Sequence, residues 1–236
     1  MNLILLLKED LLTGDDRVRL SGRRHKHIRD ILRSSVGDEL SVGAEGGRIG
    51  LGRVLAIDDK IVKMSVALEN DPPKPLPLTL ILALPRPLVL KRVLIHLTVL
   101  GVKKIILLHT NRVEKSYWKS PALEVEKIRD QFILGLEQAK DTIMPKIQFC
   151  KKFRPFVEDE LPGMIQEGKA FVAHCQGDEV FPVKGDSPAI LLIGPEGGFI
   201  PFEIGMLKKN GCKIIKFGER IMNVETAVVA CVSRLM

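Results

Sequence analysis

Apolar runs alternate with amphipathic stretches along the chain after about residue 78. Strands that are apolar along their whole length and alternate with helices are typical of a parallel sheet covered by helices on both faces. The pattern therefore predicts an α/β domain. The expected strands are 79–84, 104–109, 146–150, 170–174, 189–194 and 213–218, and the expected helices lie at about 88–100, 121–140, 153–167, 201–210 and 223–236.

The N-terminal part has a different pattern. Residues 39–42, 49–55 and 61–66 are short stretches that partly alternate in polarity, and Gly and Asp turns separate them. Such stretches are typical of short strands in a β-rich domain. One helical stretch, at about residues 25–34, interrupts them. We expect a small domain of this kind, folded as a compact barrel.

Between the two patterns lies a proline-rich segment. Asp71–Pro77 holds four prolines in seven positions. Proline lacks a backbone N–H and restricts its own φ, so this segment should sustain neither a helix nor a central strand. We expect a semi-rigid linker here, with one domain over 1–71 and a second over 72–236.

Composition and charge narrow the function classes. The 236 residues are 45% hydrophobic and 28% charged, which is ordinary for a globular protein and excludes disorder and coiled coil. The 36 Lys and Arg against 29 Asp and Glu give a net charge of +7, which favours a polyanionic partner such as nucleic acid. Four widely spaced cysteines show no metal-binding spacing, so we expect no metal and a cytoplasmic location. The apolar start, Met1–Leu7, is too short for a signal peptide, and no run is long enough to span a membrane.

A basic stretch between residues 17 and 33 is the candidate nucleic-acid contact. It holds seven Lys and Arg, with Asp30 as its one acidic residue. Such a cluster would neutralise phosphates and make binding salt-dependent. A solvated helix face is the alternative interpretation. The candidate RNA-binding residues are Arg23, Arg24, Lys26, Arg29 and Arg33.

A glycine-rich loop follows the expected strand 189–194. Gly194-Pro195-Glu196-Gly197-Gly198-Phe199 has three glycines, which allow positive φ and close approach of a ligand to the backbone. Ligands of parallel sheets bind at the carboxyl ends of the strands, where His174 and Cys175 also end a strand. We expect a binding loop, although an ordinary tight turn is the alternative.

A third segment, 218–227, follows the last expected strand. Asn223 is a plausible N-cap for the final helix, and Glu225 in the first turn suits the positive end of the helix dipole. A structural role does not explain Arg220, which lies in a loop and is a candidate for holding a phosphate or carboxylate.

Together these segments resemble the RsmE family of ribosomal RNA methyltransferases, which belongs to the SPOUT class. Four pieces match in order, and the last two are the most specific. They are His27-Ile28-x-x-Ile31-Leu32-Arg33 with Gly37-Asp38, then Leu100-Gly101-Val102 with Arg112, then Gly194–Phe199 with Glu203, and Gly218-x-Arg220-Ile221-x-x-x-Glu225-Thr226-Ala227.

The resemblance implies a PUA-like, RNA-binding β-barrel followed by a SPOUT domain with a trefoil knot. It also implies S-adenosylmethionine as cofactor, a homodimer, no membrane association, and methylation of uridine N3 in small-subunit ribosomal RNA, free or in the assembled subunit. The implied cofactor-binding residues are His174, Cys175, Ile193, Gly194, Pro195, Glu196, Gly197, Gly198, Phe217, Gly218, Arg220, Ile221, Met222, Thr226 and Ala227.

Methylation at N3 requires that the ring nitrogen is aligned with the methyl group and loses its proton. Within the resemblance, Arg220 is the candidate for stabilising the uridine anion, and Glu196 or Glu225 is the candidate proton acceptor. Arg112, from the same or the partner subunit, is the candidate clamp for a phosphate or base.

The chain departs from the family pattern on the side expected to face RNA. Asn223 stands where the family commonly has a basic residue, Val99 replaces a Glu, and 86–90 and 137–141 lack the usual motifs. A second interpretation therefore remains open: a divergent member that binds RNA without catalysis or methylates another RNA. A small-molecule enzyme on a doubly wound sheet is the third, and it predicts no affinity for RNA.

Overall fold

The structure divides the chain into two compact units. The computed structural model describes residues 2–10, 16–166, 168–177, 179–180 and 188–236. The first unit comprises the N-terminal residues up to Lys74 together with Ile133–Met144, and the second comprises Pro75–Phe132 and Pro145–Met236. The sequence-based boundary lies at 71/72 and leaves 133–144 in the second domain. Residues 133–144 join the first unit because Ile133 and Leu136 pack with Leu5 and Leu7 in one apolar cluster.

The first unit is built on a five-stranded mixed sheet. Its strands are β1 (Ile4–Leu6), β2 (Arg17–Leu20), β3 (Glu39–Ala44), β4 (Ile49–Ile57) and β5 (Val62–Asn70), in the order β1-β3-β4-β5-β2. β1 runs parallel to β3, and the other pairs are antiparallel. Within the described residues β1 and β2 are the two edges of this sheet, so the pairing does not show the closed barrel expected from the sequence. A short helix, α1 (Gly22–Lys26), continues into a π-helical turn, His27–Ile31.

Alternation of polarity decides which side chains fill the core of the first unit. In β2, Val18 and Leu20 are fully buried while Arg17 and Arg19 are exposed. Side chains point to opposite faces along a strand, so one face packs inward and the other meets water. Ile28 adds the helical contribution to this core.

A buried ion pair stabilises the first unit. The Arg24 guanidinium donates to both carboxylate oxygens of Asp10 and to the Leu5 carbonyl oxygen, the last at 2.8 Å. Asp10 ends the short turn Lys8–Asp10 and also accepts from the Leu7 N–H at 2.6 Å. The two side chains are only 13% and 6% exposed. Arg24 therefore has a structural role inside the unit.

The second unit has the parallel sheet that the sequence predicts. Its strands are β6 (Leu76–Ala83), β7 (Val102–Leu108), β8 (Lys146–Cys150), β9 (Lys169–Ala173), β10 (Glu179–Val180), β11 (Ala189–Ile193) and β12 (Lys213–Lys216). Their order is β10-β12-β9-β11-β6-β7-β8, and every pair is parallel.

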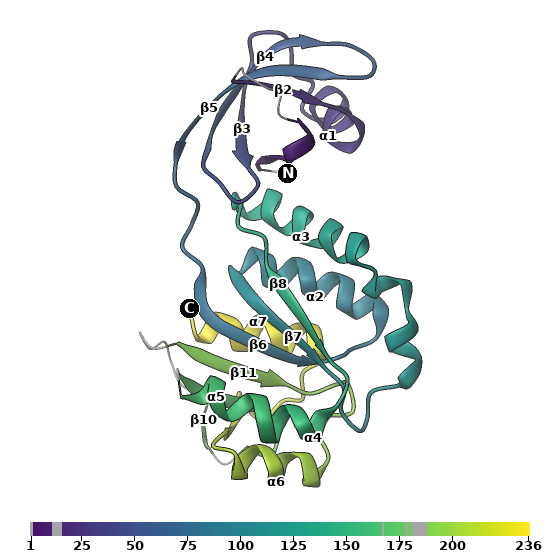
Figure 1. Ribbon diagram of the computed structural model, residues 1–236, viewed down its shortest axis with the longest axis vertical. Coiled ribbons are helices and arrows are strands. Elements are labelled where there is room, and N and C mark those ends of the chain that lie inside the picture. The colour runs from purple at the N-terminus through teal and green to yellow at the C-terminus, as the bar shows by residue number, and fades with distance from the viewer. Residues whose placement is uncertain (1, 11–15, 167, 178, 181–187) are drawn as a thin grey trace. The chain divides into compact units, whose positions relative to one another are not determined.

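Helices cover both faces of this sheet, as expected for strands that are apolar throughout (Figure 1). One face packs against the segment 153–165 and α6 (Pro201–Lys209). On the other face α2 (Pro87–Val99) packs against β7 and α7 (Val224–Arg234) packs against β11. The remaining helical segments after β6 are α3 (Val125–Ala139), whose second half belongs to the first unit, α4 (Phe153–Pro155), a π-helical turn Phe156–Glu160 and α5 (Leu161–Ile165), with 3-10 turns at Lys115–Lys119 and Pro121–Leu123. Among the described helices, none has the length and apolar character to cross a bilayer.

The proline-rich segment differs from its prediction. Pro77 lies inside β6, which is a central strand between β11 and β7. The pairing of β6 with β11 begins only at Leu78, and the pairing with β7 is irregular between Leu76 and Thr79. Pro77 thus sits where no regular ladder needs its missing N–H, which is why a central strand tolerates it.

Replacing Asp10 should destabilise the first unit. In Asp10→Ala the Arg24 guanidinium keeps its burial and loses its charged partner, which costs about 3–5 kcal/mol. We expect a lower urea midpoint by circular dichroism. Asp59→Ala is the control, because this exposed carboxylate lies 3.3 Å from Arg29 and should contribute little. Equal midpoints for Asp10→Ala and the wild type would contradict this role.

Candidate functional site

Three neighbouring strands of the second unit end level with one another. Ala173 of β9 pairs with Ile193 of β11 and with Ile215 of β12. Because the strands are parallel, the loops that follow them leave the sheet at the same edge. This is the edge at which parallel sheets bind ligands.

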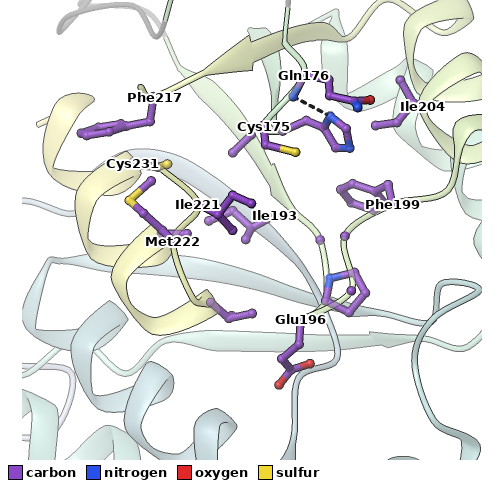
Figure 2. A pocket seen from close by; sticks show the side chains of 18 of the residues that line it. Cys175, Gln176, Ile193, Glu196, Phe199, Ile204, Phe217, Ile221, Met222 and Cys231 are labelled. Carbon is purple, nitrogen blue, oxygen red and sulfur yellow. Dashed lines mark hydrogen bonds between the residues drawn. The ribbon is translucent and has the colours of Figure 1, made fainter. Parts of the chain in front are cut away.

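These loops and the start of α7 enclose a cavity of about 780 Å³. Figure 2 shows Ile193, Ile221 and Met222 close together in this cavity, while the Glu196 carboxylate points away from them. Fourteen of the fifteen predicted cofactor-binding residues line the cavity, and Thr226 is the exception. The fourteen are His174, Cys175, Ile193, Gly194, Pro195, Glu196, Gly197, Gly198, Phe217, Gly218, Arg220, Ile221, Met222 and Ala227.

Glycine is required in the loop after β11 by its backbone geometry. The Gly198 N–H donates to the Pro195 carbonyl oxygen at 2.7 Å, and Gly198 has a φ of +71°. This left-handed conformation strains residues that have a Cβ. A Cβ on Gly194 would lie 3.2 Å from the Phe199 backbone nitrogen, so the loop also folds back tightly on itself.

Arg112, on the segment that follows β7, contacts this loop. Its guanidinium donates to the Gly197 carbonyl oxygen. A Cβ on Gly197 would lie 3.0 Å from Arg112 Cδ, so the glycine leaves room for the arginine. In the structure Arg112 holds the binding loop, and the role of Arg112 as a clamp for a phosphate or base stays a prediction.

Glu203 is a positioning residue whose role the sequence did not indicate. Its side chain is buried, and its two oxygens accept from the backbone N–H groups of Asn111 at 2.7 Å and Ile200 at 3.0 Å. Glu203 thereby joins the start of α6 to the segment that carries Arg112. A Glu at the third position of a helix often accepts from the N-cap N–H, and that spacing was the available clue.

His174 forms one side of the cavity. Its Nδ1 accepts from the Gln176 backbone N–H at 3.2 Å, drawn as the dashed line in Figure 2. Burial and then the nearby Arg112 charge lower the pKa of His174 below its usual value. A neutral imidazole with an accepting Nδ1 carries its proton on Nε2, so at neutral pH His174 is a hydrogen-bond donor through Nε2.

Arg220 and Glu225, which the sequence predicts as parts of one site, have different surroundings in the structure. Arg220 is exposed and lines the cavity, whereas Glu225 is not among the lining residues. The Glu225 carboxylate instead accepts from Arg92 Nε at 2.5 Å and so joins α7 to α2. Asn223 is confirmed as the N-cap of α7, because its Oδ1 accepts from the Thr226 N–H at 2.8 Å.

The predicted RNA-binding cations have different environments within the first unit. Arg24 pairs with Asp10, and Arg23 lies 2.7 Å from the buried Glu137 carboxylate. Burial raises the pKa of Glu137 although Arg23 acts to lower it. Arg29 bonds Asp30 and Asp59 at the surface. Lys26 and Arg33 are exposed, and the described residues form no salt bridge with either. Most of the cluster is therefore engaged within the protein.

In the described part of the chain, no three His, Cys, Asp or Glu residues are grouped as metal ligands would be. The site is built from loop backbone, apolar side chains and a few polar groups. A parallel sheet with such a cavity at its carboxyl edge is typical of α/β domains that bind nucleotides or nucleotide-like cofactors.

Residues 72–236 match the family described as the RNA methyltransferase domain, and the chain belongs to this family. The Ribosomal RNA small subunit methyltransferase E of Treponema pallidum is 28% identical, over 98% of this chain and 88% of that protein. Ribosomal RNA small subunit methyltransferase E 1 of Borreliella burgdorferi is 25% identical, over 98% and 95% of the two chains. The predicted relationship to the RsmE family is confirmed.

The fold is also that of a solved structure. The Ribosomal RNA small subunit methyltransferase E from Neisseria gonorrhoeae, crystallised with S-adenosyl methionine, superimposes with a TM-score of 0.75 at 19% identity. The match covers 99% of this chain and 95% of that one. It shows that the two chains share the architecture of both units.

Replacing Glu203 should weaken the junction between the segment at Asn111 and the start of α6. In Glu203→Gln one carboxylate oxygen becomes an NH₂ group that faces a backbone N–H, and leaving a buried donor unpaired costs about 1–3 kcal/mol. We expect a lower melting temperature and faster hydrogen exchange at the Asn111 and Ile200 amides. Glu158→Gln, at an exposed pair with Arg154, is the matched control. Unchanged exchange at both amides would show that Glu203 does not hold this junction.

Proposed function

We propose that this protein transfers a methyl group from S-adenosylmethionine to N3 of a uridine in small-subunit ribosomal RNA. The observation that carries the proposal is the cavity built by three loops at the carboxyl edge of β9, β11 and β12, inside the segment that matches the RNA methyltransferase domain. The names of the Treponema and Borreliella relatives support ribosomal RNA as the substrate. The Neisseria structure, crystallised with S-adenosyl methionine, supports the cofactor.

The residues present fit this cofactor. The volume of about 780 Å³ lies within the range of small-molecule sites, roughly 300–1,000 Å³. Ile193, Ile221 and Met222 offer an apolar wall for a purine ring, and the glycine-rich loop offers backbone groups for its polar edge. When bound, S-adenosylmethionine supplies an electrophilic methyl group to a ring nitrogen that gives up its proton.

The chain's own residues then position the uridine and accept its proton. Glu196 suits the acceptor role better than Glu225, because Glu196 lines the cavity and Glu225 pairs with Arg92. The Glu196 carboxylate is oriented by the Arg86 backbone N–H at 3.0 Å. Arg220, exposed at the cavity wall, stabilises the negative charge that develops on the uracil ring.

The finer architecture belongs to the same proposal. The first unit serves as a PUA-like module, and its exposed Lys26 and Arg33 contribute to RNA binding. The second unit has the knotted SPOUT arrangement, and the protein acts as a homodimer. A cytoplasmic location, where ribosomal RNA is modified, stays a prediction.

Replacing Gly198 should weaken cofactor binding. Alanine at a φ of +71° is strained by about 1–2 kcal/mol, so the loop would relax away from the conformation that shapes the cavity. We expect Gly198→Ala to raise the Kd for S-adenosylmethionine about tenfold by calorimetry. The control is Gly163→Ala, because Gly163 lies in α5 with nothing near its Cβ position. A wild-type Kd for Gly198→Ala would refute the loop's role.

The proposed reaction is tested by methyl transfer to small ribosomal subunits isolated from cells that lack this protein. The purified protein is incubated with methyl-labelled S-adenosylmethionine, and the digested nucleosides are identified by mass spectrometry. We expect labelled 3-methyluridine, strongly reduced in Glu196→Gln. A different methylated nucleoside would overturn the N3 assignment. No product from a protein that binds the cofactor would favour the divergent, non-catalytic interpretation.

A further inference from the structure

The cavity occupies only half of the carboxyl edge of the second sheet. The other half is formed by β6, β7 and β8, which also end level, because Ala83 pairs with Leu108 and Leu108 pairs with Cys150. The segments that leave these strands therefore extend the edge away from the cavity. They carry aromatic and basic side chains.

Three of these side chains, together with Phe149 near the end of β8, form a cluster that we call the Trp118 face: His109, Trp118, Phe149 and Lys151. The Trp118 indole N–H donates to His109 Nδ1 at 2.9 Å. The Trp118 ring packs edge to face against His109 and Phe149, with centroids 6.2 and 6.4 Å apart. The hydrogen bond and the two ring contacts fix the indole orientation, and Phe149 is still 39% exposed.

The surroundings of the Trp118 face are basic. Lys151 Nζ lies 5.7 Å from the centre of the Trp118 ring, within the range of a cation–π interaction. Lys115, Lys119 and Lys152 are exposed nearby in the sequence and form no salt bridge with any described residue. Two neighbouring carboxylates accept hydrogen bonds from neutral donors, Glu114 from Tyr117 and Glu160 from Gln148, and keep their charge. The four lysines outnumber them.

A chain of contacts connects this face to the cavity. Glu196, on the cavity wall, accepts from the Arg86 N–H, and the Arg86 side chain interacts with the Tyr117 hydroxyl. Tyr117 precedes Trp118 in the 3-10 turn Lys115–Lys119. A strand of RNA whose uridine reaches Glu196 would therefore meet the Trp118 face as it continues along the sheet edge.

We propose that the Trp118 face binds a single-stranded segment of the RNA substrate next to the methylated uridine. A base stacks on the exposed side of Phe149 and on Trp118, and Lys151 and the neighbouring lysines contact phosphates. Aromatic platforms flanked by cations are the usual means of binding unpaired nucleotides. The positive charge of the exposed lysines favours a polyanionic partner and disfavours a cationic one. This inference rests on the proposed function and identifies the surface on which its RNA substrate lies.

The test uses the intrinsic fluorescence of Trp118, the single tryptophan of the chain. The full-length protein is titrated with a labelled, single-stranded oligouridine of about 12 nucleotides, and anisotropy is recorded in parallel. We expect Trp118 emission to be quenched over the range in which the anisotropy rises. Phe149→Ala should raise the Kd about tenfold, as loss of one stacked base predicts. Lys151→Ala should reduce the slope of log Kd against log salt by about 1.

Matched controls keep the two effects specific. Phe202→Ala removes an aromatic ring that is 61% exposed on α6, and Lys209→Ala removes an exposed cation from the same helix. Neither should change the affinity for RNA. Saturation without a change in Trp118 emission, or equal affinities for Phe149→Ala and Phe202→Ala, would overturn the proposal. A Phe149→Ala variant with altered sedimentation and unchanged RNA affinity would identify the face as an interface between copies and would also overturn it.

Methyl transfer by the wild-type protein separates this inference from the proposed function. RNA binding that depends on Phe149, without formation of 3-methyluridine, supports the Trp118 face and overturns the assigned reaction. Formation of 3-methyluridine with an unchanged KM for RNA in Phe149→Ala supports the reaction and overturns the Trp118 face.

Discussion

The parallel pairing of β12, β9 and β11 is the constraint on which the site depends. Hydrogen-bonded register sets Ala173, Ile193 and Ile215 side by side, so three loops far apart in sequence begin at one edge. No loop alone encloses a cavity of the observed size. Apolar strands buried on both faces keep that register, because a shift of one residue would turn each side chain to the opposite face, where it does not fit the packed layer.

The loops acquire a defined shape from a small number of polar contacts. Glu203 holds the segment after β7 to the start of α6, and Arg112 on that segment holds Gly197. These contacts act on backbone groups, so they fix the path of the loop and leave its inner surface open to a ligand. Because the loop backbone is already fixed before binding, a ligand orders few further groups. The entropic cost of binding is therefore lower and the affinity higher. The same edge continues to the Trp118 face. In the proposed function, the carboxyl edge of one sheet therefore binds both the cofactor and the RNA.

The hydrophobic periodicity of the sequence predicted the strands and helices of the second unit closely. Within each element, the pattern of apolar residues follows directly from which side chains are buried. The sequence also indicated the segments that line the cavity, because the carboxyl ends of parallel strands meet at one edge. Features that depend on distant pairing were not predictable. Arg24 looks like a surface cation until Asp10 is found beside it, and Pro77 looks like a linker residue until the irregular pairing of β6 is known. The role of Glu203 likewise depends on Asn111, which lies 92 positions away.

The cavity at this sheet edge is the proposed site of S-adenosylmethionine. The most direct measurement is a crystal structure of the full-length protein grown with saturating cofactor. We expect cofactor density bounded by the His174–Cys175 segment, the loop 193–199 and the turn 217–222. Density at any other place, or an empty cavity in crystals of protein shown by calorimetry to bind the cofactor, would contradict this proposal.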